Sequence, residues 1–251
     1  MNLLAGGDGD DVLIGVCGAD VLMGGAGRDL ADYAAAAGPV AVDLGAGRAV
    51  GADGEDLLTE IEDVRGGAAA DILEGSSGAN RLIGGGGDDT LAGAAGADLL
   101  EGGAGHDLLE GGLDGDTLLG ADGEDLLRGN AGHDSLDGGA GVDALYGGDG
   151  DDTLHGGDGQ DSIAGGNGND CLMGGAGDDI LRAEAGNDTL VGGAGNDLYL
   201  VDSAADLVVE AAGGGTDEVR TALSSHTLGH DVENLTFTGS GAFQGIGNSL
   251  A

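Results

Sequence analysis

Apolar residues recur at every ninth position between Gly66 and Leu200, and this stretch divides into fifteen consecutive nine-residue repeats without an insertion. Numbered from its first glycine, the repeat reads G-G-x-G-x-D-x-L-x. The eighth place is Leu or Ile in every repeat except the last, which has Tyr199, and the sixth place is Asp in every repeat except one, which has Asn80. A fixed period of this length indicates a repeat architecture.

The places of the repeat predict a short coil. Glycines at places one, two and four permit positive φ, so we expect the first six residues to form a tight turn and the remaining three to form a very short strand. Alternation along that strand directs the eighth-place side chain inward. Two repeats then make one flattened coil, and repeats n and n+2 pair in parallel. The predicted fold class is all-β, a parallel β-solenoid of stacked two-repeat coils.

The period is interrupted twice. Between Tyr33 and Arg65, the pieces VAVDL (Val40–Leu44) and TEIEDV (Thr59–Val64) alternate with period two and predict strands. After Leu200, DLVVE, DEVRT and VENLTFT predict further strands, and both chain ends resemble parts of additional repeats, as expected for a piece of a longer array. The expected organisation is a short repeat block at 1–32, an irregular β spacer within the solenoid at 33–65, the main β-roll at 66–200 and an irregular β segment at 201–251, which forms a cap or begins a further repeat block.

Composition narrows the alternatives. The chain has 60 glycines, one proline and 2% aromatic residues. Collagen is excluded because glycine follows a period of nine rather than three. Disorder is the main rival at this glycine and charge content, but a disordered acidic linker has no reason to keep Leu or Ile in strict register. Cys17 and Cys171 lie in different repeats and at different places, so we expect two small apolar side chains rather than a disulfide.

The formal net charge is −40. Such a charge argues against nucleic-acid binding, which needs a basic footprint. No apolar run approaches the roughly 20 residues of a membrane span, so membrane insertion is not expected. A solvated surface does not require its charges in register, whereas many of these aspartates recur at one place of the repeat. The register favours metal binding.

Stacked coils place the sixth-place carboxylates in two columns, with neighbours roughly 5 Å apart. Like charges at this separation repel unless a cation lies between them. Carboxylates together with turn carbonyls suit Ca²⁺, which accepts 6–8 oxygens in loose geometry. Mg²⁺ requires a stricter octahedron, and Zn²⁺ requires His or Cys, which do not recur here. We therefore expect several Ca²⁺ ions, and a chain that is largely unfolded without them. The expected ligands are Asp11, Asp20, Asp29, Asp71, Asp89, Asp98, Asp107, Asp116, Asp125, Asp134, Asp143, Asp152, Asp161, Asp170, Asp179, Asp188 and Asp197.

Several repeats depart from the pattern. Asp114 stands at a glycine place, and Ala183 and Glu184 replace both leading glycines of their repeat. Asn80 keeps an oxygen but loses the charge. The second glycine is replaced by Ser76, Ala94, Ala121 and Asn130. We expect weaker or absent sites around these places.

The repeats GGDGDDTLH (Gly147–His155), GGNGNDCLM (Gly165–Met173) and GGAGNDLYL (Gly192–Leu200) resemble the calcium-binding nonapeptides of the RTX (repeats-in-toxin) family. The spacer and the stretch Asp202–Leu223 are similar to segments that interrupt RTX arrays. The resemblance implies a parallel β-roll with extracellular calcium sites. It also implies secretion, with a type I secretion apparatus as a partner, and folding outside the cell. Calcium is the other expected partner, and the oligomeric state is left open.

Catalysis is not expected in this chain. His226 and His230 are spaced as in H-E-x-x-H, but Thr227 stands where the general base belongs, so we expect two surface histidines rather than a zinc site. The chain has no lysine for a P-loop and no G-x-S-x-G. Two function classes stay open: a non-catalytic calcium-binding module acting as a spacer, stalk or secretion-assisting domain, and the C-terminal part of a secreted enzyme, toxin or adhesin whose active domain is not in this chain. An ice-binding solenoid is disfavoured, because the strand places lack a regular row of Thr.

Overall fold

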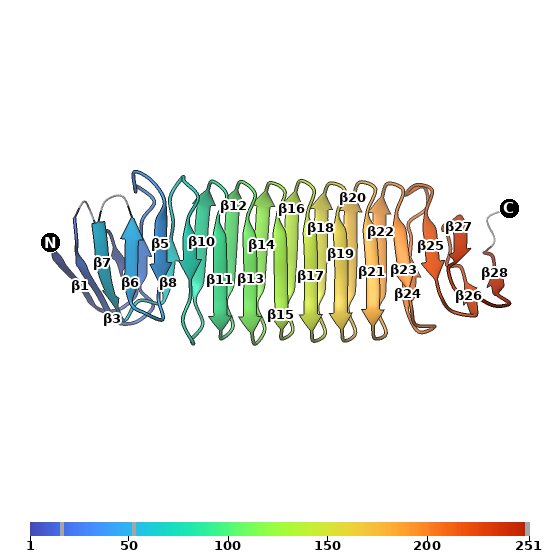
Figure 1. Cartoon of the computed structure of the whole chain (residues 1–251), viewed down its shortest axis with the longest axis horizontal. Coiled ribbons are helices and arrows are strands. Elements are labelled where there is room, and N and C mark those ends of the chain that lie inside the picture. The colour runs from blue at the N-terminus through green and yellow to red at the C-terminus, as the bar shows by residue number, and fades with distance from the viewer. Residues whose placement is uncertain (16–17, 52–53, 249–251) are drawn as a thin grey trace. The chain divides into compact units, whose positions relative to one another are not determined.

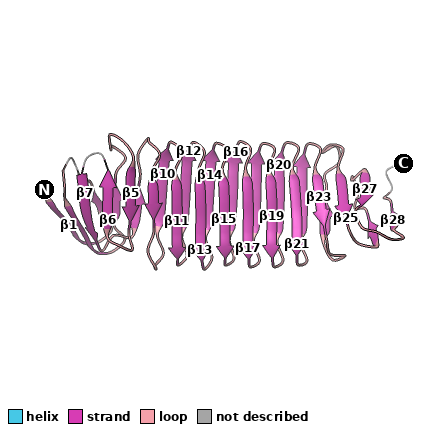
Figure 2. Ribbon diagram, in the orientation of Figure 1, coloured by secondary structure: helices cyan, strands magenta, loops and turns pink. Residues whose placement is uncertain are grey.

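The structure, a computed structural model, describes residues 1–15, 18–51 and 54–248. These residues form strands and turns and contain no helix, which confirms the all-β prediction (Figure 2). The chain divides into two compact units, Met1–Asp125 and Leu126–Ala251, called here the N-terminal half and the C-terminal half. Each half contains two sheets built from alternate strands, and each is described separately.

The N-terminal half contains the first repeats, the spacer and the beginning of the main array (Figure 1). One of its sheets has the order β1-β3-β7-β6-β5-β9-β11-β13 and the other β2-β4-β8-β10-β12-β14. Its strands are β1 (Leu3–Asp8), β2 (Val12–Leu13), β3 (Val21–Ala26), β4 (Leu30–Asp32), β5 (Val40–Asp43), β6 (Arg48–Gly51), β7 (Gly54–Thr59), β8 (Asp63–Arg65), β9 (Ile72–Glu74), β10 (Arg81–Gly86), β11 (Thr90–Ala95), β12 (Leu99–Ala104), β13 (Leu108–Leu113) and β14 (Thr117–Asp122).

The C-terminal half continues the same alternation (Figure 1). Its sheets have the orders β15-β17-β19-β21-β23-β25-β27 and β16-β18-β20-β22-β24, and β26 pairs with β28. Its strands are β15 (Leu126–Ala131), β16 (Ser135–Ala140), β17 (Ala144–Asp149), β18 (Thr153–Asp158), β19 (Ser162–Asn167), β20 (Cys171–Ala176), β21 (Ile180–Ala185), β22 (Thr189–Ala194), β23 (Leu198–Val201), β24 (Leu207–Val209), β25 (Glu218–Thr221), β26 (Ser225–Thr227), β27 (Asn234–Phe237) and β28 (Gln244–Ile246).

The register confirms the two-repeat coil. Strands of repeats n and n+2 pair in parallel, so that Leu82 lies beside Leu100 in one half and Leu154 beside Leu172 in the other. A two-stranded coil of this kind buries one apolar side chain per repeat between its sheets. The eighth-place residues accordingly form the core, from Leu73, with no exposed surface, to Tyr199, also fully buried.

The expected strand length was wrong. Strands of regular repeats span six residues rather than three, as in β18, where Thr153–Asp158 covers places seven to nine and the first three places of the next repeat. The turn therefore comprises only places four to six. The leading glycines belong to the strand. The second glycine of each regular repeat pairs with the second glycine one coil away, as Gly157 does with Gly175.

The spacer enters its sheet as an antiparallel meander. β5 pairs antiparallel with β6, and β6 with β7. The outer members join repeat strands in parallel, β7 with β3 and β5 with β9. The strand predicted in VAVDL is confirmed as β5, whereas TEIEDV is not one strand, because β7 ends at Thr59 and β8 begins at Asp63. Ile61 between them is buried, so a bend rather than an extended chain fills the core there.

The strands predicted after Leu200 are confirmed as β24, β25 and β27, which pair in parallel with the preceding coils. Near the end of the described chain, the rings of Phe237 and Phe243 stack with centroids 4.8 Å apart. Cys171 is a free thiol, and Cys17 lies outside the described residues. Within the described ranges, no helix is long and apolar enough to cross a membrane.

Candidate metal centre

The sixth-place residues end each turn, directly before the strand that carries the core residue. All the predicted ligands from Asp20 onward are buried, with exposed fractions of 0–3%, and Asp11 is half-buried. Burial of a charged side chain at every turn is unusual, because an ionised carboxylate leaves water at a high cost unless it gains partners. The partners of these carboxylates therefore decide what the turns can do.

One oxygen of most of these carboxylates accepts a hydrogen bond from a backbone N–H one coil earlier. The N–H of Asp89 donates to Oδ1 of Asp107, eighteen residues later, at 2.8 Å. In the C-terminal half, the N–H of Asp152 donates to Asp170 and that of Asp161 to Asp179, at 2.9 and 2.8 Å. These bonds connect repeats n and n+2 into columns, as expected. They also show that the backbone, and not only a cation, lies between successive carboxylates.

The other oxygen, Oδ2, is buried and accepts no hydrogen bond within the described structure. A buried acceptor without a donor costs about 1–3 kcal/mol, and more when it is charged. This condition repeats along both halves, so it is a property of the turn rather than an accident at one residue. It holds for Asp11, Asp20, Asp29, Asp89, Asp98, Asp107, Asp152, Asp161, Asp170, Asp179, Asp188 and Asp197.

Two oxygens lie against the first-place glycine of each regular repeat. One is Oδ2 of the aspartate in the same repeat, and the other is a peptide oxygen of the next coil. A Cβ added to Gly156 would collide with Asp161 Oδ2 and would lie 2.6 Å from the carbonyl oxygen of Gly174. Gly84 has the same surroundings, Asp89 Oδ2 and the carbonyl oxygen of Gly102 at 2.7 Å. The first-place glycine therefore leaves room for a carboxylate oxygen without a donor close to a peptide oxygen. Such a set suits a hard cation that prefers oxygen ligands.

The electrostatics of the turns agree with a missing positive charge. Burial raises the pKa of Asp89 to about 7, and the charges of Asp107 and Asp71 in the same column raise it further, against the lowering effect of a backbone hydrogen bond. Burial likewise raises the pKa of Asp179 to about 7. The pKa values of Asp152 and Asp170 rise to about 6 for the same first cause. Burial without a counter-charge therefore makes ionisation of these carboxylates less favourable than in water.

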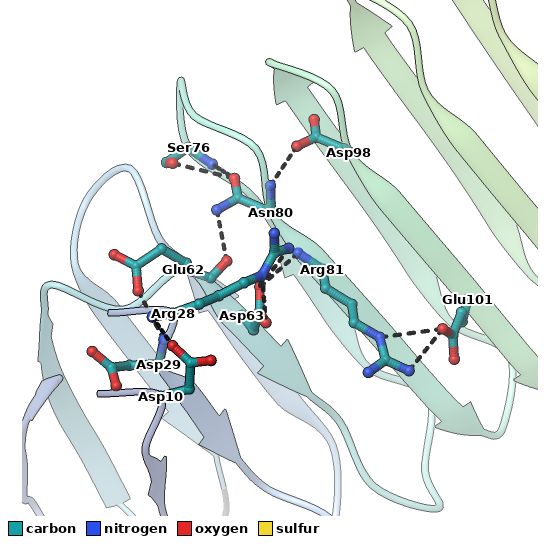
Figure 3. Close-up of polar contacts among 10 residues, drawn as sticks. All are labelled: Asp10, Arg28, Asp29, Glu62, Asp63, Ser76, Asn80, Arg81, Asp98 and Glu101. Carbon is teal, nitrogen blue, oxygen red and sulfur yellow. Dashed lines mark hydrogen bonds and ion pairs between the residues drawn. The ribbon is translucent and has the colours of Figure 1, made fainter. Parts of the chain in front are cut away.

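Two sixth-place residues differ, because the protein itself satisfies them. Both oxygens of Asp71 accept backbone N–H groups, from Val40 at 2.8 Å and Gly67 at 2.5 Å. The amide of Asn80 donates to the carbonyl oxygen of Glu62 at 2.7 Å, and its Oδ1 accepts from the N–H of Ser76 at 2.7 Å (Figure 3). Both side chains therefore have donors for the oxygen that the other turns leave without one, and the weaker site expected at Asn80 stays a prediction.

Arginine side chains supply positive charge beside Asn80. Arg28 Nε lies 3.0 and 2.9 Å from the two carboxylate oxygens of Asp63, and Arg81 Nη2 lies 2.9 Å from Glu101 Oε1 (Figure 3). In this part of the N-terminal half, guanidinium groups partner acids that lie near the columns.

The columns contain carboxylates that were not among the predicted ligands. In the N-terminal half, the N–H of Asp20 donates to Asp56 at 2.8 Å and that of Asp29 to Glu62 at 2.9 Å. In the C-terminal half, Asp206, Asp217 and Glu233 accept in the same way from Asp188, Asp197 and Asp217. Spacing alone would have revealed Asp206, which follows Asp188 by eighteen residues. Asp56 carries the repeat pattern itself, because it stands sixth in GADGEDLLT (Gly51–Thr59), which differs only in its last residue from GADGEDLLR (Gly120–Arg128). Glu62 follows an irregular stretch and carried no such signal.

The departures at the second place strain the backbone. Ala94, Ala121, Asn130 and Glu184 have φ of 80, 83, 75 and 64°, and Asp114 at the fourth place has 73°. Glycine occupies this region freely, whereas other residues pay for it. A positive φ is therefore kept at these places where the glycine is lost. Ala183 places a methyl group where a regular repeat has a first-place glycine, beside the Asp188 carboxylate.

No cluster of His or Cys with metal-ligand geometry occurs among the described residues. His226 is half-buried on β26, where burial lowers its pKa, and His230 is exposed.

Comparison with protein families supports calcium binding by these repeats. The family model described as RTX calcium-binding nonapeptide repeat (4 copies) matches residues 2–31, 65–100, 83–118, 110–145, 119–154, 137–172, 146–181, 165–199 and 173–208, more than half of the chain. Comparison with curated proteins found no match. The repeats that bind calcium in this family are those that form the β-roll here. The chain belongs to the RTX calcium-binding nonapeptide repeat family.

Proposed function

We propose that this chain is a secreted, non-catalytic calcium-binding module whose β-roll folds when Ca²⁺ enters the turns. The observation that carries the proposal is the buried Oδ2 without a hydrogen-bond donor, which recurs in both halves, as at Asp89, Asp161 and Asp179. A backbone or side-chain donor satisfies an ordinary buried carboxylate. Cations bound in the turns would give each of these oxygens a partner and would offset part of the net charge of −40.

The proposed ligands are the Oδ2 atoms of the sixth-place aspartates, with peptide oxygens of the first-place glycines beside them. Asp71 is excluded because both of its oxygens accept backbone hydrogen bonds. Bound Ca²⁺ supplies positive charge where the chain has only acceptors. The residues themselves hold the coils in register through Oδ1, so ion binding and coil stacking use different oxygens of one carboxylate.

Calcium-dependent folding explains a secreted role. A metal that binds only the folded state adds its binding free energy to folding. Extracellular calcium modules bind with Kd of about 10⁻⁴–10⁻³ M, far above the calcium of a cytoplasm. The chain would then stay unfolded before export through a type I apparatus and fold outside as a spacer, stalk or secretion-assisting domain.

A calcium titration followed by far-UV circular dichroism and isothermal titration calorimetry tests the proposal. We expect β structure to appear cooperatively as calcium is added, with several ions bound per chain. A spectrum in excess chelator equal to that in saturating calcium would contradict it.

A matched pair of variants tests the ligands. Asp152→Asn with Asp170→Asn changes two neighbours of one column, linked by a 2.9 Å hydrogen bond. Asp149→Asn with Asp158→Asn removes the same charge from exposed third-place residues. We expect the first pair to lower the ion count and raise the calcium midpoint, and the second to leave the ion count unchanged. Equal ion counts in the two would exclude the sixth-place ligands.

A further inference from the structure

Three carboxylates meet at the end of the main array. One oxygen each of Asp197, Glu210 and Asp217 lies within 4.8 Å of the others. Asp197 belongs to the last nonapeptide, whereas Glu210 follows β24 and Asp217 precedes β25, both outside the repeat pattern. Asp197 and Asp217 are buried and Glu210 is half-buried. In the regular turns, by contrast, each carboxylate comes from a sixth place.

An unpartnered oxygen is aimed into this cluster. Asp197 is 2% exposed, and its Oδ1 accepts the N–H of Asp179 at 2.9 Å, but its Oδ2 has no partner. A Cβ added to Gly192 would meet Asp197 Oδ2, the Tyr199 hydroxyl and, at 2.6 Å, Glu210 Oε1. Four oxygen-bearing side chains, counting Asp217, therefore face one small volume beside the backbone of Gly192.

Tyr199 fixes the position of Glu210. It is fully buried, stands at an eighth place where the other repeats of the main array have Leu or Ile, and donates its hydroxyl hydrogen to Glu210 Oε1. A buried Tyr requires such a polar partner. Core packing alone does not require a Tyr in place of Leu at this position. The hydroxyl of Tyr199 is needed to hold Glu210 against the last coil.

The cluster lacks a counter-charge from the protein. No Arg or His among the described residues forms an ion pair with any of the three acids. Asp217 Oδ1 accepts the N–H of Asp197 at 2.8 Å, which leaves its second oxygen for another partner. Burial, followed by the charge of Asp217, raises the pKa of Glu210 to about 7, as expected for acids that crowd together without a cation.

We propose that Glu210 and Asp217, which lie outside the repeats, join Asp197 of the last nonapeptide turn in binding one Ca²⁺ ion, and that this ion fastens the segment from Glu210 to Asp217 onto the last repeat. The inference rests on the proposed function, because the β-roll must fold before the three acids meet. Three carboxylates concentrate more negative charge than a regular turn, and higher ligand charge raises calcium affinity. In the folded chain, the site is expected to hold its ion more tightly than the regular turns.

Terbium luminescence provides a local measurement. Tb³⁺ replaces Ca²⁺ at oxygen sites and emits when a nearby tyrosine transfers energy to it. The chain has three tyrosines and no tryptophan, and the Tyr199 hydroxyl faces the proposed ion. In the calcium-folded full chain, we expect tyrosine-sensitised emission with the first equivalent of Tb³⁺. Glu210→Gln should weaken that first step at least tenfold and remove one ion from the calorimetric calcium count.

Glu218→Gln is the matched control. It makes the same charge change one residue after Asp217, but its side chain pairs with Arg220 at 2.7 Å and does not belong to the cluster. We expect its terbium titration and its ion count to equal those of the parent. If Glu210→Gln gives the parental titration and count, the site is wrong.

Tyr199→Phe keeps the proposal falsifiable if Glu210→Gln does not fold. It retains all three carboxylates and an apolar core residue, so the β-roll should form. Emission from the first equivalent should fall strongly, and unchanged emission would mean that the ion lies beside Tyr33 or Tyr146, which overturns the proposal. A parent chain that binds no calcium would refute the proposed function instead. A chain that binds calcium and folds, but loses no ion on Glu210→Gln, refutes only this site.

Discussion

The turns of Gly147–Arg182 and the turn that contains Asn80 differ in how they pair the buried side-chain oxygens of the sixth place. In Gly147–Arg182, Asp152, Asp161, Asp170 and Asp179 each bury an Oδ2 that no donor reaches. At Asn80 an amide replaces the carboxylate, donates to Glu62 and accepts from Ser76, while Arg28 lies nearby in an ion pair with Asp63 (Figure 3). The first arrangement needs an external cation and the second does not. Under the proposed function, calcium dependence would therefore differ from repeat to repeat.

Calcium removal should separate the two arrangements most strongly. Each occupied site contributes about 2.7 kcal/mol at a calcium concentration of 100 Kd, or roughly a hundredfold in local exchange. We expect amides in Gly147–Arg182 to lose protection at a smaller chelator excess than amides between Asp63 and Asn80. Hydrogen exchange read by mass spectrometry measures both regions in one sample. Simultaneous loss at all chelator concentrations would show that the protein contacts at Asn80 give no local independence.

Acid should partly replace calcium. The pKa values of Asp89 and Asp179 are near 7 in the ion-free fold, against an ordinary value of 3.8, so the folded chain binds more protons than the unfolded chain between about pH 4 and pH 7. The ion-free fold is then favoured at low pH and loses stability as the pH rises toward 7. Circular dichroism in chelator should show more β structure at pH 5 than at pH 7.5.

With calcium present, the sign reverses for binding. Protons compete with Ca²⁺ for the same oxygens, so the calcium midpoint should rise as the pH falls below about 7. A midpoint independent of pH between 5 and 7.5 would show that these carboxylates are not the ligands.

Asn80→Asp converts the satisfied turn into a regular one. It removes the donor to the Glu62 carbonyl and adds a charge, which should cost about 1–3 kcal/mol when calcium is low. Thermal unfolding at low and at saturating calcium should show a larger calcium-dependent shift than the parent shows. Asp98→Asn is the reverse change in the same half and should lower both the ion count and the shift. Identical shifts for the parent and Asn80→Asp would contradict the comparison.

The smallest effect concerns backbone strain. Ala94→Gly relieves a φ of 80° and should raise the free energy of unfolding by about 1 kcal/mol in saturating calcium. Its neighbour Ala95 has no positive φ, so Ala95→Gly should lower that free energy by about 0.5–1 kcal/mol. Denaturant unfolding distinguishes the two signs, and destabilisation by both would show that the second place gains nothing from glycine.

Much of the fold followed from the period alone. The two-repeat coil, the burial of the eighth-place residue and the alignment of the sixth-place residues in columns all followed from the period. Each nine-residue repeat makes the same contacts as the repeat two places before it. The six-residue strand did not follow, because glycines that permit a turn also permit extension, and pairing with the next coil decided between them at Gly157 and Gly175.

The amino-acid sequence by itself determined which oxygens are available, since Asp recurs at one place and lysine is absent. Tertiary structure decided which of those oxygens are satisfied. Oδ1 and Oδ2 of one aspartate are chemically equal until a neighbouring coil donates to the first and leaves the second among acceptors. Glu62 and Glu210 reach the columns only through the folding of an irregular segment, whose length no period predicts. The same side chains recur along the chain, but whether each oxygen finds a hydrogen-bond donor depends on which coil lies next to it in the fold.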